Sequence, residues 1–106
     1  PQARDWYVKI FGAKPGVRAD SPVADVPGAQ LRFAKTATPA VTTKGRVLDH
    51  IGFDVKNMDA FVKRLEAAGV KLERPVLRND KTGDALTFIQ DPWGTYIELN
   101  ERGNPL

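Results

Sequence analysis

The feature that most constrains the fold of this chain is a sequence pattern that occurs twice. The segments "DWYVKIFGAK" at 5–14 and "DAFVKRLEAAGVK" at 59–71 share an aspartate, an aromatic residue, a Val-Lys pair and then a glycine. Each is followed by three strand candidates, and the last one opens after a glycine, in "GAQLRF" at 28–33 and "GTYIELN" at 94–100. Repeats of this kind usually mean that two half-domains share one sheet or core.

Both copies of the pattern have the apolar spacing of an amphipathic helix. In 3–13 the apolar residues fall at i, i+3, i+4, i+7 and i+8, which predicts a helix with one continuous apolar stripe. A second stripe runs through 57–70, where Asn57 is a good N-cap candidate and Gly69 stands where a glycine ends a helix. We assign these stripes to the core and not to catalysis.

The remaining segments are typical of strands. In the second half we expect strands at 47–55, 70–77, 85–90 and 95–101, and in the first half at 16–20, 22–26 and 29–35. Between the last two strands, "DPWG" at 91–94 has the proline and glycine positions of a type I turn and predicts a hairpin.

These elements predict two modules within one domain, because a chain of 106 residues is of single-domain size. The second module, 46–106, has the order strand, helix and three strands. The first module, 1–35, has the same order but lacks its opening strand, which we expect to lie upstream of Pro1. Residues 36–45 have no periodicity and predict a linker.

Alternation along the strands puts three possible metal ligands on faces opposite the apolar residues. They are His50, the only histidine of the chain, Glu98 and Gln30. Arg32 shares its side with Gln30, and Tyr96 shares its side with Glu98. Imidazole, carboxylate and amide oxygen together suit Zn, Ni, Mn or Fe(II). The alternative for His50 and Glu98 is a hydrogen-bonded strand histidine and a simple surface carboxylate.

Composition excludes several other classes of function. There is no cysteine, which rules out disulfides and thiolate metal sites and fits a cytoplasmic location. The net charge of +3 comes from scattered residues, so we expect no nucleic-acid partner. No apolar run reaches the length of a membrane span, so we expect no membrane partner.

Three strings give the chain a family resemblance: "DWYVKIFGA", "LDHIGFDVKNMDAFVKRLEAAGVK" and "FIQDPWGTYIELNE". In these strings and in the order of its elements, the chain resembles the vicinal oxygen chelate superfamily, also called the glyoxalase/bleomycin-resistance/dioxygenase group. The resemblance covers nearly the whole chain and is more specific in the second half. It implies an α+β fold in which two βαβββ modules form a curled mixed sheet around a divalent metal ion.

The resemblance also implies ligand positions in this chain. His50 matches the ligand of the first strand of the second module, and Glu98 matches the carboxylate ligand of its last strand. Gln30 matches the last-strand position of the first module, where glyoxalase I enzymes have a glutamate that also acts as a base. Since an amide cannot abstract a proton, that chemistry is not expected at Gln30. A fourth ligand would come from the missing first strand.

Two functions of different classes follow from the resemblance. One is a metal-dependent enzyme of the lyase, isomerase or ring-cleaving dioxygenase type, which acts on a small oxygen-chelating substrate that Arg32 and Tyr96 orient. The other is a metal-free protein that sequesters a bleomycin-type antibiotic. A purely structural or interaction role ranks lowest. We expect a homodimer, because a module without its opening strand leaves a sheet edge unpaired. The substrate and the catalytic residue cannot be assigned, because members of one fold differ in these details.

Overall fold

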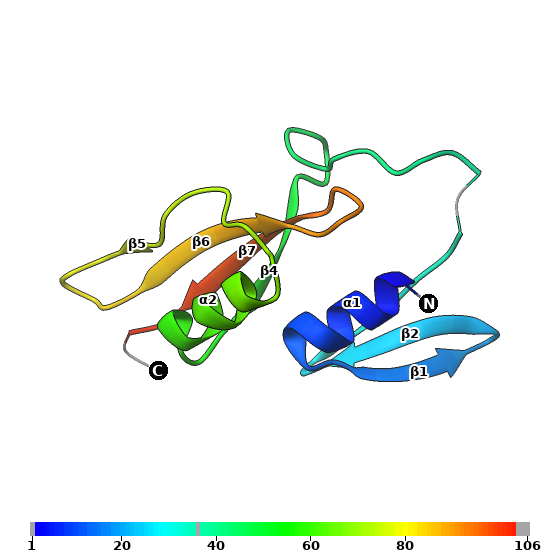
Figure 1. Ribbon diagram of the computed structural model, residues 1–106, viewed down its shortest axis with the longest axis horizontal. Coiled ribbons are helices and arrows are strands. Elements are labelled where there is room, and N and C mark those ends of the chain that lie inside the picture. The colour runs from blue at the N-terminus through cyan, green and yellow to red at the C-terminus, as the bar shows by residue number, and fades with distance from the viewer. Residues whose placement is uncertain (1, 36, 104–106) are drawn as a thin grey trace. The chain divides into compact units, whose positions relative to one another are not determined.

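The computed structural model describes residues 2–35 and 37–103. The chain divides into two compact units, Pro1–Pro39 and Ala40–Leu106. The boundary falls inside the segment 36–45 that the sequence predicts as a linker, and residues 1, 36 and 104–106 of the predicted modules and linker lie outside the described ranges. Each unit contains one helix and one sheet, as Figure 1 shows.

In the first unit, one helix packs on a three-stranded antiparallel sheet. The guanidinium of Arg4 donates a hydrogen bond of 3.1 Å to the carbonyl of Gly16, and the ring of Tyr7 lies 5.6 Å from that of Phe33. The strand order is β1-β2-β3. The elements are α1 (Gln2–Phe11), β1 (Lys14–Arg18), β2 (Ser21–Val26) and β3 (Ala29–Arg32).

The second unit has a four-stranded mixed sheet with the order β4-β7-β6-β5. β4 pairs with β7 in parallel, and the other neighbours are antiparallel. An α+β fold with a mixed sheet is therefore confirmed. The elements are β4 (His50–Asp54), α2 (Met58–Ala67), β5 (Leu77–Arg78), β6 (Ala85–Gln90) and β7 (Tyr96–Glu101).

The ends of α2 are those that its sequence predicts. The side-chain oxygen of Asn57 accepts a hydrogen bond of 3.1 Å from the backbone N–H of Ala60, which is the bond expected of an N-cap. At the other end Gly69 has a φ of +78°, and the Val70 N–H donates to the carbonyl of Leu65 at 2.9 Å. This is the glycine-dependent C-terminal motif that satisfies the last carbonyls of a helix.

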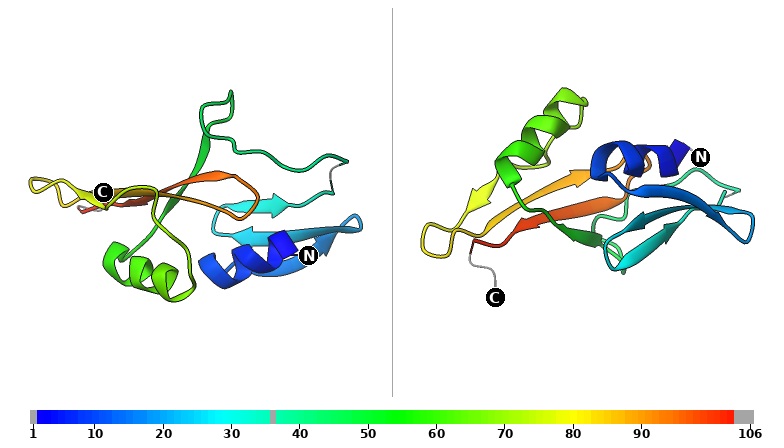
Figure 2. Two further views of the ribbon diagram at one scale, coloured as in Figure 1. Left: turned by 45° about the horizontal axis from the view of Figure 1, so that its top comes forward. Right: turned by 90° about the horizontal axis from the view of Figure 1, so that it is seen from below.

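The core of the second unit lies between α2 and one face of the sheet (Figure 2). Met58 and Leu65 of α2 are completely or almost completely buried. On the sheet, Ile97 and Leu99 of β7 are fully buried at alternate positions, as predicted from sequence. Glu101 continues this face and accepts a hydrogen bond of 2.7 Å from the backbone N–H of Met58.

The predicted strand at 70–77 is wrong, because only Leu77 and Arg78 pair in the sheet. The segment before them follows β6 through one backbone bond, from Glu73 N–H to Phe88 C=O at 2.8 Å. The next carbonyl, that of Arg74, accepts from the hydroxyl of Thr87 instead. Pro75 has no N–H to continue a ladder, so regular pairing stops there.

The strand predicted at 47–55 is shorter than expected. β4 begins only at His50, and Val47 and Leu48 before it are exposed. Val47, an apolar residue of the predicted strand, is therefore not part of the buried face of the sheet. Beyond the other end of the strand, the Val55 N–H still donates to the carbonyl of Asn100 at 2.7 Å.

The hairpin between β6 and β7 is confirmed, and Thr43 of the predicted linker forms hydrogen bonds with its turn. The Gly94 N–H donates to the carbonyl of Asp91 at 3.1 Å, which closes the predicted turn. Thr43 donates its N–H to the carbonyl of Gly94 at 2.9 Å, and its hydroxyl accepts from the Tyr96 N–H at 2.8 Å. Part of the predicted linker is thus held against the turn that follows β6.

Candidate functional site

The candidate site lies on the face of the second sheet opposite the α2 core, which we call the His50 face. Register partners in a sheet point to the same side, and alternate residues of a strand share a face. β4 and β7 pair His50 with Tyr96, Gly52 with Glu98 and Asp54 with Asn100, whereas β6 pairs Phe88 with Glu98. The His50 face consists of His50, Gly52 and Asp54 of β4, Tyr96, Glu98 and Asn100 of β7, and Leu86, Phe88 and Gln90 of β6.

His50 and Glu98 come together on this face, as alternation from the sequence suggests. The Nε2 atom of His50 lies 3.8 Å from Oε1 of Glu98. The side chain of His50 is 41% exposed and that of Glu98 is 27% exposed, so neither side chain is buried. The other carboxylate oxygen of Glu98 accepts a hydrogen bond of 2.8 Å from the Asn100 amide.

Asp49 orients the imidazole from its other side. One carboxylate oxygen of Asp49 lies 2.9 Å from Nδ1 of His50, and the other accepts from the backbone N–H of Gly45. The Gly45 N–H and, after it, the His50 ring lower the pKa of Asp49 below its ordinary value. An ionised carboxylate can only accept a hydrogen bond, so Nδ1 of His50 is the donor in this contact, and Nε2 is the ring nitrogen on the side of Glu98.

A stacked pair of aromatic rings supports the imidazole. The rings of Phe88 and Tyr96 lie 4.8 Å apart with an angle of 12° between them, and His50 meets both edge-on at 5.8 and 6.3 Å. The Arg74 guanidinium lies 4.8 Å from the centre of the Phe88 ring, and the Lys44 ammonium 5.1 Å from that of Tyr96. These cation–π contacts keep both rings in place beneath His50.

The ring of Tyr96 has little surface left for a ligand, since the residue is only 4% exposed. Sequence reasoning missed Asp49, Phe88, Lys44 and Arg74. The string "LDH" contains a signal for Asp49, because a carboxylate directly before a histidine can reach its ring where the backbone is not yet a strand. For Arg74 and Lys44 we find no signal in the sequence.

Gln30 and Arg32 lie in the first unit, on β3. The side-chain oxygen of Gln30 accepts from Arg18 at 3.3 Å, and its amide donates to Asp25 at 2.7 Å. Arg32 donates to the hydroxyl of Ser21 at 3.1 Å. Both side chains are thus engaged with neighbours in their own sheet.

The donor atoms of the His50 face match what a divalent metal ion needs, but they supply only two ligands. Imidazole nitrogen and carboxylate oxygen form a mixed donor pair, and an orienting carboxylate on the far ring nitrogen is the usual support of a ligating histidine. Among residues 2–35 and 37–103, no three His, Cys, Asp or Glu side chains gather into a ligand set. Further ligands would have to come from other groups.

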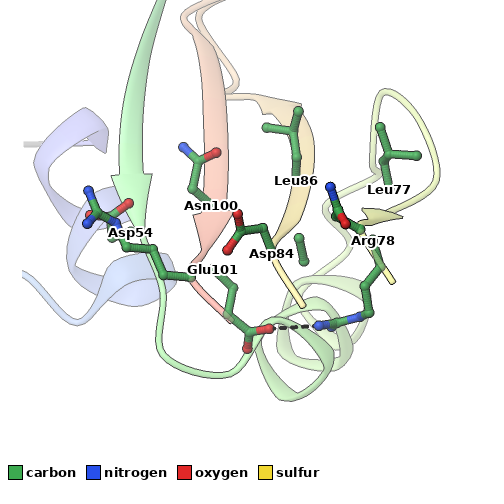
Figure 3. A pocket seen from close by; sticks show the side chains of 10 residues that line it. Asp54, Leu77, Arg78, Asp84, Leu86, Asn100 and Glu101 are labelled. Carbon is green, nitrogen blue, oxygen red and sulfur yellow. Dashed lines mark hydrogen bonds and ion pairs between the residues drawn. The ribbon is translucent and has the colours of Figure 1, made fainter. Parts of the chain in front are cut away.

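The same face continues into a cavity of about 680 Å³ at the far end of the strands. Its floor is a row of four register partners, Asp54, Asn100, Leu86 and Leu77, one from each strand of the sheet. Figure 3 shows these side chains and, beside them, the ion pair of 3.0 Å between Arg78 and Glu101. The other lining residues are Asn79, Asp84, Ala85 and Arg102.

Comparison with solved structures places this fold among known ones. A fosfomycin resistance protein, FosX, from Listeria monocytogenes is 16% identical, with a TM-score of 0.73 over 93% of this chain and 80% of that one. A glyoxalase family protein from Enterococcus faecalis is 25% identical, with a TM-score of 0.69 over 95% of this chain and 88% of that one. TioX from Micromonospora sp. ML1 is 20% identical, with a TM-score of 0.69 over 99% of this chain and 89% of that one.

Comparison of the sequence with protein families agrees with the comparison of structures. The match covers more of the chain than any single motif does. No curated protein matches the chain. In the described residues no helix has the length and apolar character needed to cross a bilayer. The model of one family matches residues 1–99, which is nearly the whole chain. The chain therefore belongs to the Glyoxalase/Bleomycin resistance protein/Dioxygenase superfamily.

Proposed function

We propose that this protein is a divalent-metal-dependent enzyme that acts on a small substrate with two neighbouring oxygens, as a lyase, an isomerase or a ring-cleaving dioxygenase. The observation that carries the proposal is the pair of His50 Nε2 and Glu98 Oε1, 3.8 Å apart on one face, with Asp49 behind the imidazole. Gln30 is the weaker third ligand of this proposal, with Zn, Ni, Mn or Fe(II) as the candidate ions.

Each residue of the site has a separate task in this proposal. When bound, a divalent ion supplies Lewis acid chemistry for a substrate oxygen that gains negative charge. Asp49 accepts the hydrogen bond of Nδ1 and so leaves Nε2 of the imidazole available as a metal ligand. Asn100 fixes the carboxylate of Glu98 through its hydrogen bond of 2.8 Å. Arg32 is the proposed contact for a polar group of the substrate, whereas Tyr96, which is almost fully buried, supports the imidazole.

Metal analysis tests the proposal directly. The protein is stripped with EDTA, incubated with Zn, Ni, Mn or Fe(II) in turn, desalted and measured by elemental analysis. We expect about one ion per site in the parent protein and loss of that ion in His50→Ala and Glu98→Gln. Glu66→Gln, which removes an exposed carboxylate on α2, is the matched control and keeps the ion. No metal in the parent protein, or equal metal in all four proteins, would overturn the proposal.

A second candidate is metal-free binding of a bleomycin-type antibiotic. The observation that favours it is the cavity of about 680 Å³. Its lining includes neither His50 nor Glu98, so binding there would not need the proposed metal ligands. Calorimetry with bleomycin and EDTA-treated protein separates the two functions. Binding without metal supports sequestration, whereas binding only after metal is restored supports the enzyme.

A further inference from the structure

The cavity beside the candidate metal site contains two opposite charges that have no partner in the described chain. Asp54 and Arg102 both line it, and they form no ion pair with each other or with another described residue. The other charged lining residues are already engaged. Arg78 pairs with Glu101 at 3.0 Å, and Asp84 accepts from the Gly103 N–H at 2.9 Å. One carboxylate and one guanidinium are therefore left for a ligand.

The cavity also has an apolar part next to these charges. Leu77 and Leu86 are register partners on neighbouring strands and both line it. Leu77 is 64% exposed and extends this apolar surface toward the edge of the sheet. Ligand pockets typically combine such an apolar surface with a few polar groups that fix orientation.

The cavity adjoins the proposed metal ligands on the His50 face. Asn100 lines the cavity and donates to Glu98 at 2.8 Å, so the two sites share this side chain. On β4 the residue between His50 and Asp54 on this face is Gly52. A Cβ at Gly52 would lie 3.7 Å from Oε2 of Glu98 and 3.8 Å from the Asn100 amide nitrogen. With no side chain there, β4 places nothing between the cavity and Glu98.

We propose that this cavity binds a small zwitterion of the amino-acid class with a branched apolar side chain. Asp54 binds its ammonium group, Arg102 binds its carboxylate, and Leu86 contacts the apolar side chain. A carboxylate and a guanidinium each recognise the opposite charge by hydrogen-bonded ion pairing. That the occupant is also the substrate of the His50–Glu98 site rests on the proposed function, whereas its binding does not.

Three probes with the same branched chain test this assignment: leucine, 3-methylbutylamine and 4-methylpentanoate. They carry both charges, only the cation and only the anion, respectively. Binding is followed by amide shifts in ¹⁵N spectra of the whole chain, titrated into the millimolar range because such small ligands bind weakly. EDTA is present because amino acids themselves chelate metal ions, so the result does not depend on a metal site.

We expect leucine to move the amide signals of Asp54, Leu86 and Asn100 and to bind at least about fivefold more tightly than either singly charged probe. Asp54→Asn removes the preference of leucine over 4-methylpentanoate, and Arg102→Gln removes its preference over 3-methylbutylamine. Leu86→Ala weakens all three probes by about threefold, because the shared apolar contact is lost. Asp20→Asn, an exposed carboxylate of the first unit, changes none of these values.

Equal affinity for the three probes, shifts outside the cavity, or no shift with leucine overturns the assignment. Each variant keeps the spectral dispersion of the parent protein, which shows that it is folded. Leucine binding in a protein that takes up no metal supports the zwitterion site and overturns the proposed function. Metal uptake without leucine binding supports the proposed function and overturns the zwitterion site. Failure of one proposal can therefore be told from failure of the other.

Discussion

Asp49 shows why neighbouring residues can act together although strand alternation separates them. Residues i and i+1 of a strand point to opposite faces, and on that rule Asp49 cannot face His50. β4 begins at His50, however, so Asp49 lies in the turn before the strand and its carboxylate reaches Nδ1 at 2.9 Å. The sequence rule identified the face of His50 and Glu98 but missed the residue that orients the imidazole, because it assumed a longer strand.

Replacing Asp49 tests its role at the residue scale. Asp49→Asn keeps the size and an acceptor for the Gly45 N–H but removes the charge that fixes the proton on Nδ1. We expect metal affinity to fall by about 10- to 100-fold, the usual effect of losing such a support. Competition with a chelator of known affinity measures this, and Asp20→Asn is the control. Unchanged affinity in Asp49→Asn would show that the imidazole is oriented without the carboxylate.

Glu101 makes a contribution to stability that depends on pH. The Met58 N–H and, after it, the Arg78 guanidinium lower the pKa of Glu101 below its ordinary value. Ionised Glu101 therefore stabilises the fold above the pKa that it has in the unfolded chain, and this contribution disappears as the pH falls through its pKa in the folded chain.

We expect the free energy of unfolding of Glu101→Gln to depend less on acid pH than that of the parent protein. Between about pH 7 and about pH 3, the free energy of unfolding decreases more in the parent protein than in this variant. Urea unfolding at a series of pH values measures the difference. Glu66→Gln, whose carboxylate is exposed on α2, keeps the parent response. A Glu101→Gln curve parallel to that of the parent protein contradicts the assignment.

At the scale of elements, the ends of α2 were predictable because they depend on contacts within a few residues. Asn57 and Gly69 satisfy backbone groups of their own helix, and both act as their sequence positions suggest. The strand at 70–77 was not predictable, because its pairing depends on β6. There Thr87 takes the carbonyl of Arg74, and Pro75 offers no N–H. Apolar alternation in that segment gave no information on either contact.

The cap of α2 can be tested by two substitutions at one position. Asn57→Ala removes the acceptor for the Ala60 N–H, and we expect a loss of about 1 kcal/mol in the free energy of unfolding. Asn57→Asp retains the acceptor and adds a charge that suits a helix N-terminus, so its stability stays close to that of the parent protein. Denaturant titration of the three proteins decides the point, and equal stability of all three contradicts the cap.

The turn between β6 and β7 requires glycine for two reasons. Gly94 has a φ of +98°, and a Cβ there would lie 2.8 Å from the Cα of Thr42. We expect Gly94→Ala to lower the free energy of unfolding by about 2 kcal/mol or more, because strain and a backbone clash add up. Gly28→Ala is the matched control. It has a φ of +80° but nothing within 4 Å of the added Cβ, so it reports the strain alone. Equal losses in the two variants would show that Thr42 moves freely.

At the scale of the whole molecule, the repeat predicts the element order of both units. The order helix and three strands recurs, as α1 with β1 to β3 and α2 with β5 to β7. A sequence repeat gives information on how each unit folds, because the contacts among the helix and strands of a unit lie within that unit. It contains no information on the contacts of Gln30, which in the structure are Arg18 and Asp25 of its own sheet.

The outer edge of β4 leads to a prediction about assembly. In the sheet order β4-β7-β6-β5 the described part of β4 pairs with β7 on one side only. An exposed edge strand tends to pair with another chain. We expect a homodimer, with light scattering at micromolar concentration giving twice the mass of the chain. A monomeric parent protein contradicts this expectation.

The parallel pairing of β4 with β7 also determines when the site can form during folding. His50 and Glu98 face each other only across this pair, and α2, β5 and β6 separate the two strands in the chain. Such non-local pairing is slow because a long loop must close first. On the ribosome, α2, β5 and β6 are added to the chain after His50 and before its carboxylate partner. A nascent chain therefore has no His50–Glu98 pair until β7 has been added, and under the proposed function metal uptake would mark the end of folding of this unit.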